Sequence, residues 1–447
     1  MKTYKNLYEP MLQDEALKAC FKDAAKHKTL RKDVKKVLDD LDSNVEILKG
    51  ILEREDFMPA YHTPKIIKEP SCKKERRIVK PNYKYEQVVG HCVIRQFKPI
   101  VLDGLYEFSC GSIPGRGCHS GAKWVRKWVK QYKGKKFYVL KMDIRHFFDS
   151  IDRLILKQML CKKIKDDRFL RLMFVLIEYD KIAEAIHLLE ENRINISMDN
   201  SRELATAIAY DDPAKAESVL SRLCIPEELH AELTAIVHEQ RKGVPLGYYT
   251  SQWFGNFVLK DMDHWIKQEL GAEHYIRYMD DMVIMGKSKR QLHRMRISVD
   301  EYLQEHLNLR IKDDWQVFRF EYDTGRQKKN GETIYAGRML DFMGFQFHCD
   351  RTTLRKSTLC RARRKAKRIR IKRQSGKVSW FEATQMLSYM GGIVAADVYD
   401  YYTEYIKPCV NVKKLKKIVS NHARRITQNG NSLSATGGNT GVQAVGC

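Results

Sequence analysis

Two apolar, strand-like segments flank a pair of adjacent aspartates in YIRYMDDMVIMG, residues 275–286. This pattern predicts a β-hairpin whose turn presents Asp280 and Asp281. A further apolar strand is predicted in FYVLKMD, where it ends at Asp143, and a helix is expected beyond it with Ser150 as its N-cap. The pattern therefore places three carboxylates at the ends of strands.

Most of the remaining chain has apolar residues at helical spacing, as in DVKKVLDDLDSNVEILKGILE near the start. Residues 61–100 are basic, β-like and interrupted by proline before a helix, and strands are also expected around DFMGFQFHC. Residues 178–225 differ, since they are rich in Ala, Leu and Glu and are acidic within a basic chain. They predict an inserted pair or trio of helices that projects from the rim of the fold.

The composition is that of a folded protein with a polyanionic partner. The 447 residues are enough for two or three subdomains, and 43% of them are hydrophobic. A formal net charge of +25 favours nucleic acid, because Lys and Arg that neutralise phosphates release counterions. From Arg351 to Trp380 there are thirteen Lys or Arg residues and no Asp or Glu. After about residue 426, a Gly/Asn/Ser tail predicts disorder.

Membrane proteins and disulfide-rich proteins are not favoured by this sequence. It has no run of about 18 apolar residues and no apolar signal-peptide core, so a cytoplasmic protein without a membrane partner is expected. Eleven cysteines are scattered without a C-x-x-C pair, which favours reduced thiols over a zinc site.

The adjacent aspartates are explained best by bound divalent cations. Mg²⁺ prefers carboxylate oxygens together with substrate phosphates, and two such ions can stabilise the attacking and leaving oxygens of a phosphoryl transfer. Asp143 is the candidate for a third carboxylate. The alternative is a solvated turn, with Asp149 and Asp152 as ordinary helix-start residues.

Four motifs in one order resemble those of reverse transcriptases: KMDIRHFFDSID, GVPLGYYTSQ, YMDD and FMGF, with similarity from about residue 60 to 347. The resemblance implies an α+β right-hand polymerase with fingers, a palm of a small antiparallel sheet and helices, and a helical basic thumb. The expected boundaries are an N-terminal helical region at 1–60, fingers at 61–135, palm at 136–164, helical insertion at 165–240, palm with primer grip at 241–347, thumb at 348–425 and a disordered tail at 426–447.

The resemblance also implies the metal site. Asp143 and Asp280 would ligate two Mg²⁺ ions, for which Mn²⁺ is the alternative, and Asp281 would complete the site or lie just outside it. The backbone carbonyl of Ile144 would add a ligand. Asp143, Asp280 and Asp281 are therefore the expected catalytic residues of an RNA-directed DNA polymerase.

Further roles follow from the same resemblance. Phe148 matches the aromatic residue beneath the sugar of the incoming nucleotide, the alternative being a core ring beside Phe147. Arg76 matches the residue that holds the triphosphate, with Arg77 and Lys74 as alternatives, although each could be a solvated charge. The nucleotide would also meet Gly247, Ser251 and Gln252, and glycine would allow close backbone approach. The primer grip would comprise Phe342, Met343, Gly344 and Phe345. Nucleic acid would be held by Arg361, Arg363, Arg364, Lys365, Lys367, Arg368 and Arg370.

Two positions depart from the family pattern. Leu246 stands where many relatives have glutamine, so a polar contact to the nucleotide is missing. The lysine that often follows in the family is not evident, since Lys312 lies near its place and Trp315 occupies it. That role stays unassigned.

The opening residues and the SQ ending of GVPLGYYTSQ most resemble prokaryotic enzymes of diversity-generating retroelements and their phage-defence relatives. The expected partners are template RNA, an RNA/DNA hybrid and deoxynucleoside triphosphates, with an accessory protein or a second copy of the chain docked on 178–225. The first expectation is cDNA synthesis in a diversity-generating retroelement of a prokaryotic cytoplasm. The alternatives are a defence enzyme that makes DNA from a dedicated non-coding RNA, and a non-catalytic, maturase-like RNA-binding protein.

Overall fold

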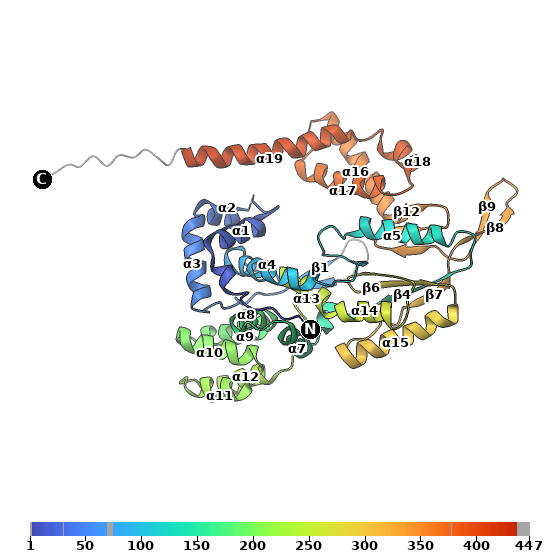
Figure 1. Cartoon of the computed structure of the whole chain (residues 1–447). Helices are drawn as coiled ribbons and strands as arrows, with labels where there is room; N and C mark the ends of the chain where they lie inside the picture. Colours follow the sequence, from blue (N-terminus) through green and yellow to red (C-terminus); the bar gives the residue numbers. More distant parts are fainter. Residues whose placement is uncertain (1, 30, 69–74, 377, 436–447) are drawn as a thin grey trace. The chain divides into compact units, whose positions relative to one another are not determined.

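A computed structural model describes residues 2–29, 31–68, 75–376 and 378–435. The chain forms two compact units, of which the first contains Met1–Pro114 and Tyr138–Val317 and the second contains Gly115–Phe137 and Phe318–Cys447. Both units combine helices with short strands, so the fold is of the α+β class, as predicted (Figure 1). In the part of the chain described here, no helix is long and apolar enough to cross a membrane.

A five-stranded sheet forms the centre of the first unit. Its strand order is β3-β5-β6-β4-β7. The predicted hairpin of YIRYMDDMVIMG is confirmed, since β5 and β6 pair in antiparallel fashion. The strands are β3 (Ser109–Cys110), β4 (Tyr138–Asp143), β5 (His274–Tyr278), β6 (Asp281–Gly286) and β7 (Gln316–Arg319). Apolar runs rather than alternation predicted β5 and β6, and the inner residues of both strands are buried.

Helices pack on this sheet through their apolar faces. α15 (Lys289–Leu307) packs against β4 and β6, and it buries Leu292, Met295 and Val299. α4 (Val88–Leu102) packs against α13 (Tyr249–Val258), which continues into α14 (Lys260–Gln268). Figure 1 shows α14 and α15 beside the strands that carry the aspartates.

The N-terminal region is helical, as its amphipathic pattern predicts. It comprises η1 (Glu9–Leu12), α1 (Asp14–Ala25), α2 (Lys32–Asp39) and α3 (Leu41–Glu53). α1 packs on α3 and α4 through buried residues that include Leu17 and Phe21. A two-stranded ribbon follows, formed by β1 (Lys65–Lys68) and β2 (Glu75–Ile78), and η2 (Tyr83–Gln87) leads into α4.

The helix expected after Asp143 begins later than predicted. A short α6 (Phe147–Ser150) comes first, and α7 (Arg153–Lys163) follows it. The N-cap of α7 is Asp152 rather than Ser150, since the Asp152 carboxylate accepts the N–H groups of Leu154 and Ile155. A carboxylate at this position satisfies the free N–H groups of the first turn.

The acidic segment forms helices that belong to the core of the first unit. Residues 178–225 form the expected three helices, α9 (Tyr179–Glu191), α10 (Met198–Ala209) and α11 (Pro213–Ser221), between α8 (Asp167–Ile177) and α12 (Glu227–His238). Leu204, Ala205 and Ile208 of their apolar stripes are at most 2% exposed and belong to one core with residues of the N-terminal helices. These stripes are therefore covered within the chain, by packing among these helices and against the rest of the first unit. The expected projection from the rim and the partner expected on 178–225 stay predictions.

The second unit contains a three-stranded antiparallel sheet, a hairpin and a group of helices. The strands are β8 (Tyr322–Gln327), β9 (Thr333–Ala336), β10 (Leu340–Phe342), β11 (Phe345–Phe347) and β12 (Thr352–Leu354). α5 (Cys118–Gln131) contacts β11. The helices are α16 (Lys356–Gln374), α17 (Trp380–Val394), α18 (Tyr399–Tyr401), η3 (Tyr402–Ile406) and α19 (Val412–Ala435).

The compact units divide the chain differently from the predicted regions. α5 was expected in the fingers and Phe342–Phe345 in the palm, yet both belong to the second unit. α19 extends to Ala435, so residues 426–435 of the expected disordered tail are helical. Residues 436–447 lie outside the described residues.

Candidate active site

The first unit brings the three predicted aspartates to one edge of its sheet. Asp143 ends β4, Asp281 begins β6, and the two are directly opposite partners in the antiparallel register. Asp280 occupies the preceding turn, where its carbonyl accepts the N–H of Ile144 at 3.2 Å. All three aspartates are half-buried. Side chains directly opposite in an antiparallel pair lie on the same face, so two like charges are held close together.

Lysines lie near this edge. The ammonium of Lys141 is 3.8 Å from the Asp281 carboxylate. The main-chain N–H of Lys312 donates to the main-chain carbonyl of Asp143 at 2.8 Å. The hydrogen bond to Asp314 raises the pKa of Lys312 above its usual value, and the charges of Asp143 and Asp281 raise it further against slight burial. Sequence reasoning left Lys312 unassigned and missed Lys141, although Lys141 stands two residues before the first aspartate.

These residues fit divalent cations with oxygen ligands. Directly opposite like charges are unfavourable in a sheet, and a bound cation would remove that repulsion. Carboxylate oxygens with a nearby backbone carbonyl form the donor set that Mg²⁺ and Mn²⁺ prefer. Asp143, Asp280 and Asp281, with the Ile144 carbonyl, are the groups that would hold them.

A buried arginine supports the turn between β5 and β6. Arg277 is 0% exposed and binds Asp263 through two hydrogen bonds, from Nε at 2.7 Å and from Nη2 at 2.6 Å. Its Nη1 donates to the carbonyl of Met279 at 2.9 Å. Met279 precedes the aspartates and has a φ of +56°, a conformation that L residues rarely adopt. Sequence reasoning missed Arg277, whose signal was a charge within an apolar strand.

β3 holds the same turn from its other side. The N–H of Met279 donates to the carbonyl of Cys110 at 3.2 Å. A Cβ added to Gly111 would lie 2.9 Å from Cγ of Met279, so a side chain there would displace the turn. Asn256 donates to the carbonyl of Gly111 at 3.2 Å. The geometry of the aspartate turn therefore depends on contacts from three separate parts of the sequence.

Phe148 lies in α6, five residues after Asp143. Its ring is half-buried, with its centroid 5.1 Å from that of Phe147. A Cβ added to Gly255 would lie 3.2 Å from the Phe148 ring, so glycine in α13 allows this close approach. The half-exposed ring is compatible with contact to a substrate, and its role as a sugar gate stays a prediction.

Gly247 and Ser251 are required by the protein's own packing. Gly247 has a φ of +120°, and a Cβ there would lie 1.8 Å from the carbonyl oxygen of Val79. Glycine at this position thus allows a close approach to Val79, the residue that follows β2, and the expected approach to a nucleotide stays a prediction. Ser251 is 1% exposed and donates to the carbonyl of Pro245 at 2.6 Å. Its hydroxyl stabilises the loop, whereas Gln252 is exposed on α13.

The predicted triphosphate-binding residues lie in or beside β2. Arg76 pairs with Ile67 in the ribbon, and its side chain lies outside the described residues, as does Lys74. Arg77 is exposed and lines a pocket of about 480 Å³ in the first unit. The loop that ends at Leu246 forms another wall of that pocket.

The predicted primer grip forms a tight hairpin in the second unit. Met343 and Gly344 both have positive φ, at +52° and +84°, between β10 and β11. Phe342 and Phe345 are buried, and the Phe345 ring contacts His119 at a centroid distance of 5.8 Å. Only the two turn residues of the motif are thus accessible enough to contact a ligand.

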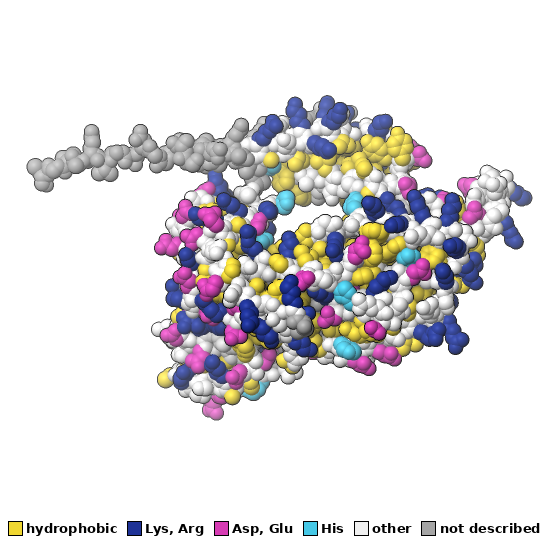
Figure 2. Space-filling model, in the orientation of Figure 1, with side chains coloured by type: hydrophobic (Ala, Val, Ile, Leu, Met, Phe, Trp, Pro, Cys, Tyr) yellow, Lys and Arg dark blue, Asp and Glu magenta, His cyan; other side chains and the backbone are white. Residues whose placement is uncertain are grey.

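α16 separates its small apolar residues from its basic residues. Ala362, Ala366 and Ile369 are buried. The exposed basic residues are Arg364, Lys367, Arg368 and Arg370, and the half-buried ones are Arg361, Arg363 and Lys365. The guanidinium of Arg363 lies 3.9 Å from the centre of the Tyr405 ring, so this cation is engaged within the unit. Figure 2 shows Lys and Arg side chains gathered over the region of α16 and its neighbouring helices.

A second group of possible metal ligands lies in the second unit. Ligand atoms of Glu321, Cys349 and Asp350 lie within 4.8 Å of one another. Asp350 is bound by Tyr335 at 2.9 Å and by Arg351 at 3.0 Å. Burial and the nearby Glu321 raise the pKa of Cys349 to about 11, so its thiol is neutral at pH 7. Since the Asp350 carboxylate is already engaged by Tyr335 and Arg351, we assign no metal to this group.

Comparisons with known proteins agree with the motifs. A family model described as reverse transcriptase (RNA-dependent DNA polymerase) matches residues 194–346. The matched range includes Asp280 and Asp281 and ends within β11, whereas Asp143 and Phe148 precede it. This match supports a reverse transcriptase, an RNA-directed DNA polymerase, as the sequence predicts.

Two further comparisons cover shorter or more distant similarity. An uncharacterized 91 kDa protein in a cob intron of Schizosaccharomyces pombe is 36% identical over 86 residues, which span 18% of this chain and 10% of that protein. Telomerase from Candida albicans, solved with a telomeric RNA fragment, has 12% identity and a TM-score of 0.38, covering 83% of this chain and 59% of its own. The corresponding telomerase from Candida tropicalis has 11% identity and a TM-score of 0.38, covering 86% and 57%. The chain thus spans a tenth of the curated relative and less than three fifths of these telomerase chains.

Proposed function

We propose that this chain copies an RNA template into DNA from deoxynucleoside triphosphates. The observation that carries the proposal is the direct pairing of Asp143 with Asp281, with Asp280 in the adjacent turn. Repulsion between like charges makes this arrangement costly, and bound divalent cations would relieve it. A non-catalytic, maturase-like RNA-binding protein would have no need to retain it.

Bound Mg²⁺ or Mn²⁺ would activate the primer hydroxyl and neutralise charge on the reacting phosphate. Asp143 and Asp280 would hold these ions at the sheet edge, where the ammonium of Lys141 lies 3.8 Å from the Asp281 carboxylate. Arg277 fixes the turn through Met279, so the carboxylates need little reorganisation during the reaction. Phe148 would exclude a ribose 2′-hydroxyl, and the exposed cations of α16 would contact nucleic-acid phosphates.

Substitution of the aspartates tests the proposal directly. Asp280→Asn and Asp143→Asn should abolish deoxynucleotide incorporation on a primed RNA template and leave RNA affinity nearly unchanged, because only cation binding is lost. Asp149→Asn is the matched control, since Asp149 is an exposed aspartate of the same motif. Incorporation by either active-site variant within about tenfold of wild type would overturn the assignment, given that removal of such a ligand should cost far more.

For the biological setting, we propose a diversity-generating retroelement, on the basis of the SQ ending of GVPLGYYTSQ. The similarity to a protein in a cob intron supports a second candidate, an intron-encoded reverse transcriptase. A phage-defence enzyme is the third. Sequencing the RNA that crosslinks to the protein in its native cells separates them: a variable-repeat template supports the first, an intron the second, and a dedicated non-coding RNA the third.

A further inference from the structure

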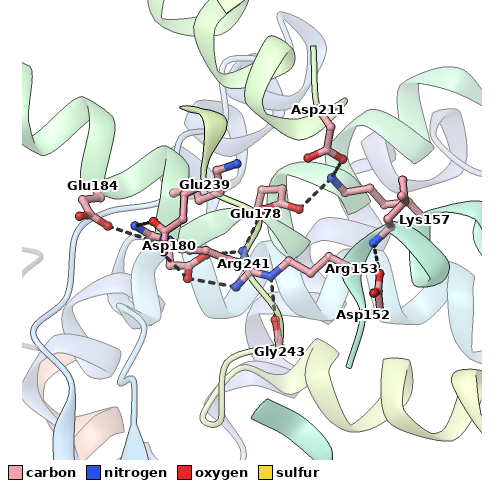
Figure 3. A network of polar contacts seen from close by, with 12 residues as sticks. Asp152, Arg153, Lys157, Glu178, Asp180, Glu184, Asp211, Glu239, Arg241 and Gly243 are labelled. Carbon is pink, nitrogen blue, oxygen red and sulfur yellow. Dashed lines mark hydrogen bonds and ion pairs between the residues drawn. The ribbon is translucent and has the colours of Figure 1, made fainter. Parts of the chain in front are cut away.

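Arg153, in the first turn of α7, is surrounded by groups from two other parts of the chain (Figure 3). Its side chain is 5% exposed. Nη1 donates to Glu178 at 2.8 Å and to Asp180 at 2.7 Å, while Nη2 donates to the second oxygen of Asp180 at 3.0 Å. Nε donates to the main-chain carbonyl of Gly243 at 2.8 Å. The guanidinium therefore links the start of α9 to the loop that precedes Gly247.

The same loop is bound to the segment that carries Phe148. The N–H of Val244 donates to the carbonyl of Phe148 at 2.8 Å, and the N–H of Gly243 donates to that of Ile151 at 2.7 Å. A Cβ on Gly243 would lie 2.9 Å from the backbone of Asp149. The loop and α6 are thus in direct backbone contact, and movement of one displaces the other.

Additional cations complete the network around the two carboxylates. Lys157 binds Glu178 at 2.8 Å and Asp211 at 2.6 Å, and Arg241 binds Glu184 at 2.7 Å and lies 3.6 Å from Asp180. Burial alone would raise the pKa of Asp180, but the hydrogen bonds and charge of Arg153, with the charge of Arg241, lower it below its usual value. Asp180 is therefore ionised at pH 7 and holds the guanidinium in one orientation.

Buried ion pairs contribute little net stability compared with apolar residues of similar volume. The network instead fixes the orientation of its groups, because a planar guanidinium with fixed donors can bind two carboxylates and a carbonyl only in one arrangement. The acidic helices supply both carboxylates, so the geometry of the Gly243–Gly247 loop depends on them.

We infer that Arg153 is a positioning residue, through which Glu178 and Asp180 of the acidic helices set the placement of the Gly243–Gly247 loop and of Phe148, and thereby the binding and sugar selection of the incoming nucleotide. This inference rests on the proposed function. It gives the acidic helices a role within the first unit that does not depend on a docked partner.

The test compares Asp180→Asn and Arg153→Lys with a matched control, Glu203→Gln. Glu203 also forms an ion pair in these helices, but its partner Arg222 is half-exposed and bonded away from the loop. Hydrogen exchange of a peptide spanning residues 240–250 reports on the loop without requiring activity. Exchange of the Gly243 and Val244 amides should become about tenfold faster in both test variants, as expected for loss of a charge-assisted hydrogen bond. Glu203→Gln should leave it unchanged.

Kinetics on a primed RNA template provide the second measurement. Both test variants should raise KM for deoxynucleotides about tenfold, with kcat changed less, and should weaken discrimination against ribonucleotides. Exchange and kinetics equal to those of Glu203→Gln, in an active protein, would overturn the positioning role and leave the polymerase assignment intact. If the wild type incorporates no nucleotide, the proposed function fails. Unchanged hydrogen exchange of the Gly243 and Val244 amides in both test variants would still refute the link between Arg153 and the loop.

Discussion

Arg277 donates a 2.9 Å hydrogen bond to the carbonyl of Met279, which directly precedes the adjacent aspartates. Arg277→Met should destabilise the protein by about 3–5 kcal/mol, because Asp263 would remain buried without its partner cation. The double variant with Asp263→Leu should recover much of that stability, since both charges are removed together. Chemical denaturation measures both effects.

Measurements of polymerase activity should separate the contribution of Arg277 to stability from its contribution to the aspartate turn. The double variant lacks the donor to Met279, so incorporation should stay well below wild type even where stability is recovered. Recovery of both properties together would show that Arg277 serves stability alone.

Gly247→Ala should disturb the junction with β2. A methyl group there would meet the Val79 carbonyl at 1.8 Å, so the loop or the strand must move, at a cost of about 3 kcal/mol or more. Gly271→Ala is the control, because Gly271 also has positive φ, at +61°, but no atom lies within 4 Å of the added Cβ. It should lose only about 1 kcal/mol. Equal losses in urea denaturation would contradict the proposed clash.

Phe148→Val should admit ribonucleotides while retaining DNA synthesis, because a steric gate acts by clash. Phe147→Leu provides the comparison, since the neighbouring Phe147 is 2% exposed and should affect stability rather than sugar choice. Competition between labelled ribo- and deoxynucleotides measures the ratio. Unchanged discrimination in Phe148→Val would place the gate at another residue.

Charge reversal on α16 should change the salt dependence of nucleic-acid binding. Replacing exposed Arg364, Lys367 and Arg370 by Glu should flatten the slope of log affinity against log salt by about two to three units if each contacts a phosphate. Reversing three exposed cations of α15, namely Lys289, Arg290 and Arg294, controls for net charge. Similar slopes for the two variants would mean that α16 is only a solvated face.

His91 should make the protein less stable in acid. Burial, with help from the charge of Lys28, lowers its pKa from 6.5 to about 4, and its ring stacks on Tyr249 at 4.3 Å. The unfolded chain takes up a proton as pH falls below 6.5 while the folded state stays neutral, so stability decreases between pH 6.5 and 4. His91→Gln should flatten Tm against pH in this window. A profile parallel to that of wild type would exclude His91 as the cause.

Local patterns were sufficient to predict the elements that carry the aspartates. The β5–β6 hairpin and the strand ending at Asp143 follow from short apolar runs and the polar turn between two of them. The family match covers the last three of the four motifs, in residues 194–346. Neither conclusion required knowledge of distant contacts.

Other features depend on contacts between remote segments, which a single sequence does not show. The requirement for glycine at 247 comes from Val79, and Ser251 is used within its own loop. The Ala and Leu stripes of the acidic helices belong to one core with residues from distant parts of the chain, and a single sequence does not show this shared core. The charge of Arg277 within an apolar strand was a visible signal that pattern reasoning passed over.

The parallel pairing of β3 with β5 has a consequence for how the chain is made. Ser109 and Arg277, which are register partners in this pair, are separated by 168 residues. At typical translation rates, β3 leaves the ribosome about 8–34 seconds before its partner strand has been synthesised. During that interval α13 has not yet been made, so the apolar face of α4 on which it packs stays exposed. Exposed apolar surface on a nascent chain promotes aggregation. Production of this protein should therefore respond to chaperones that bind nascent chains and to slower growth at low temperature.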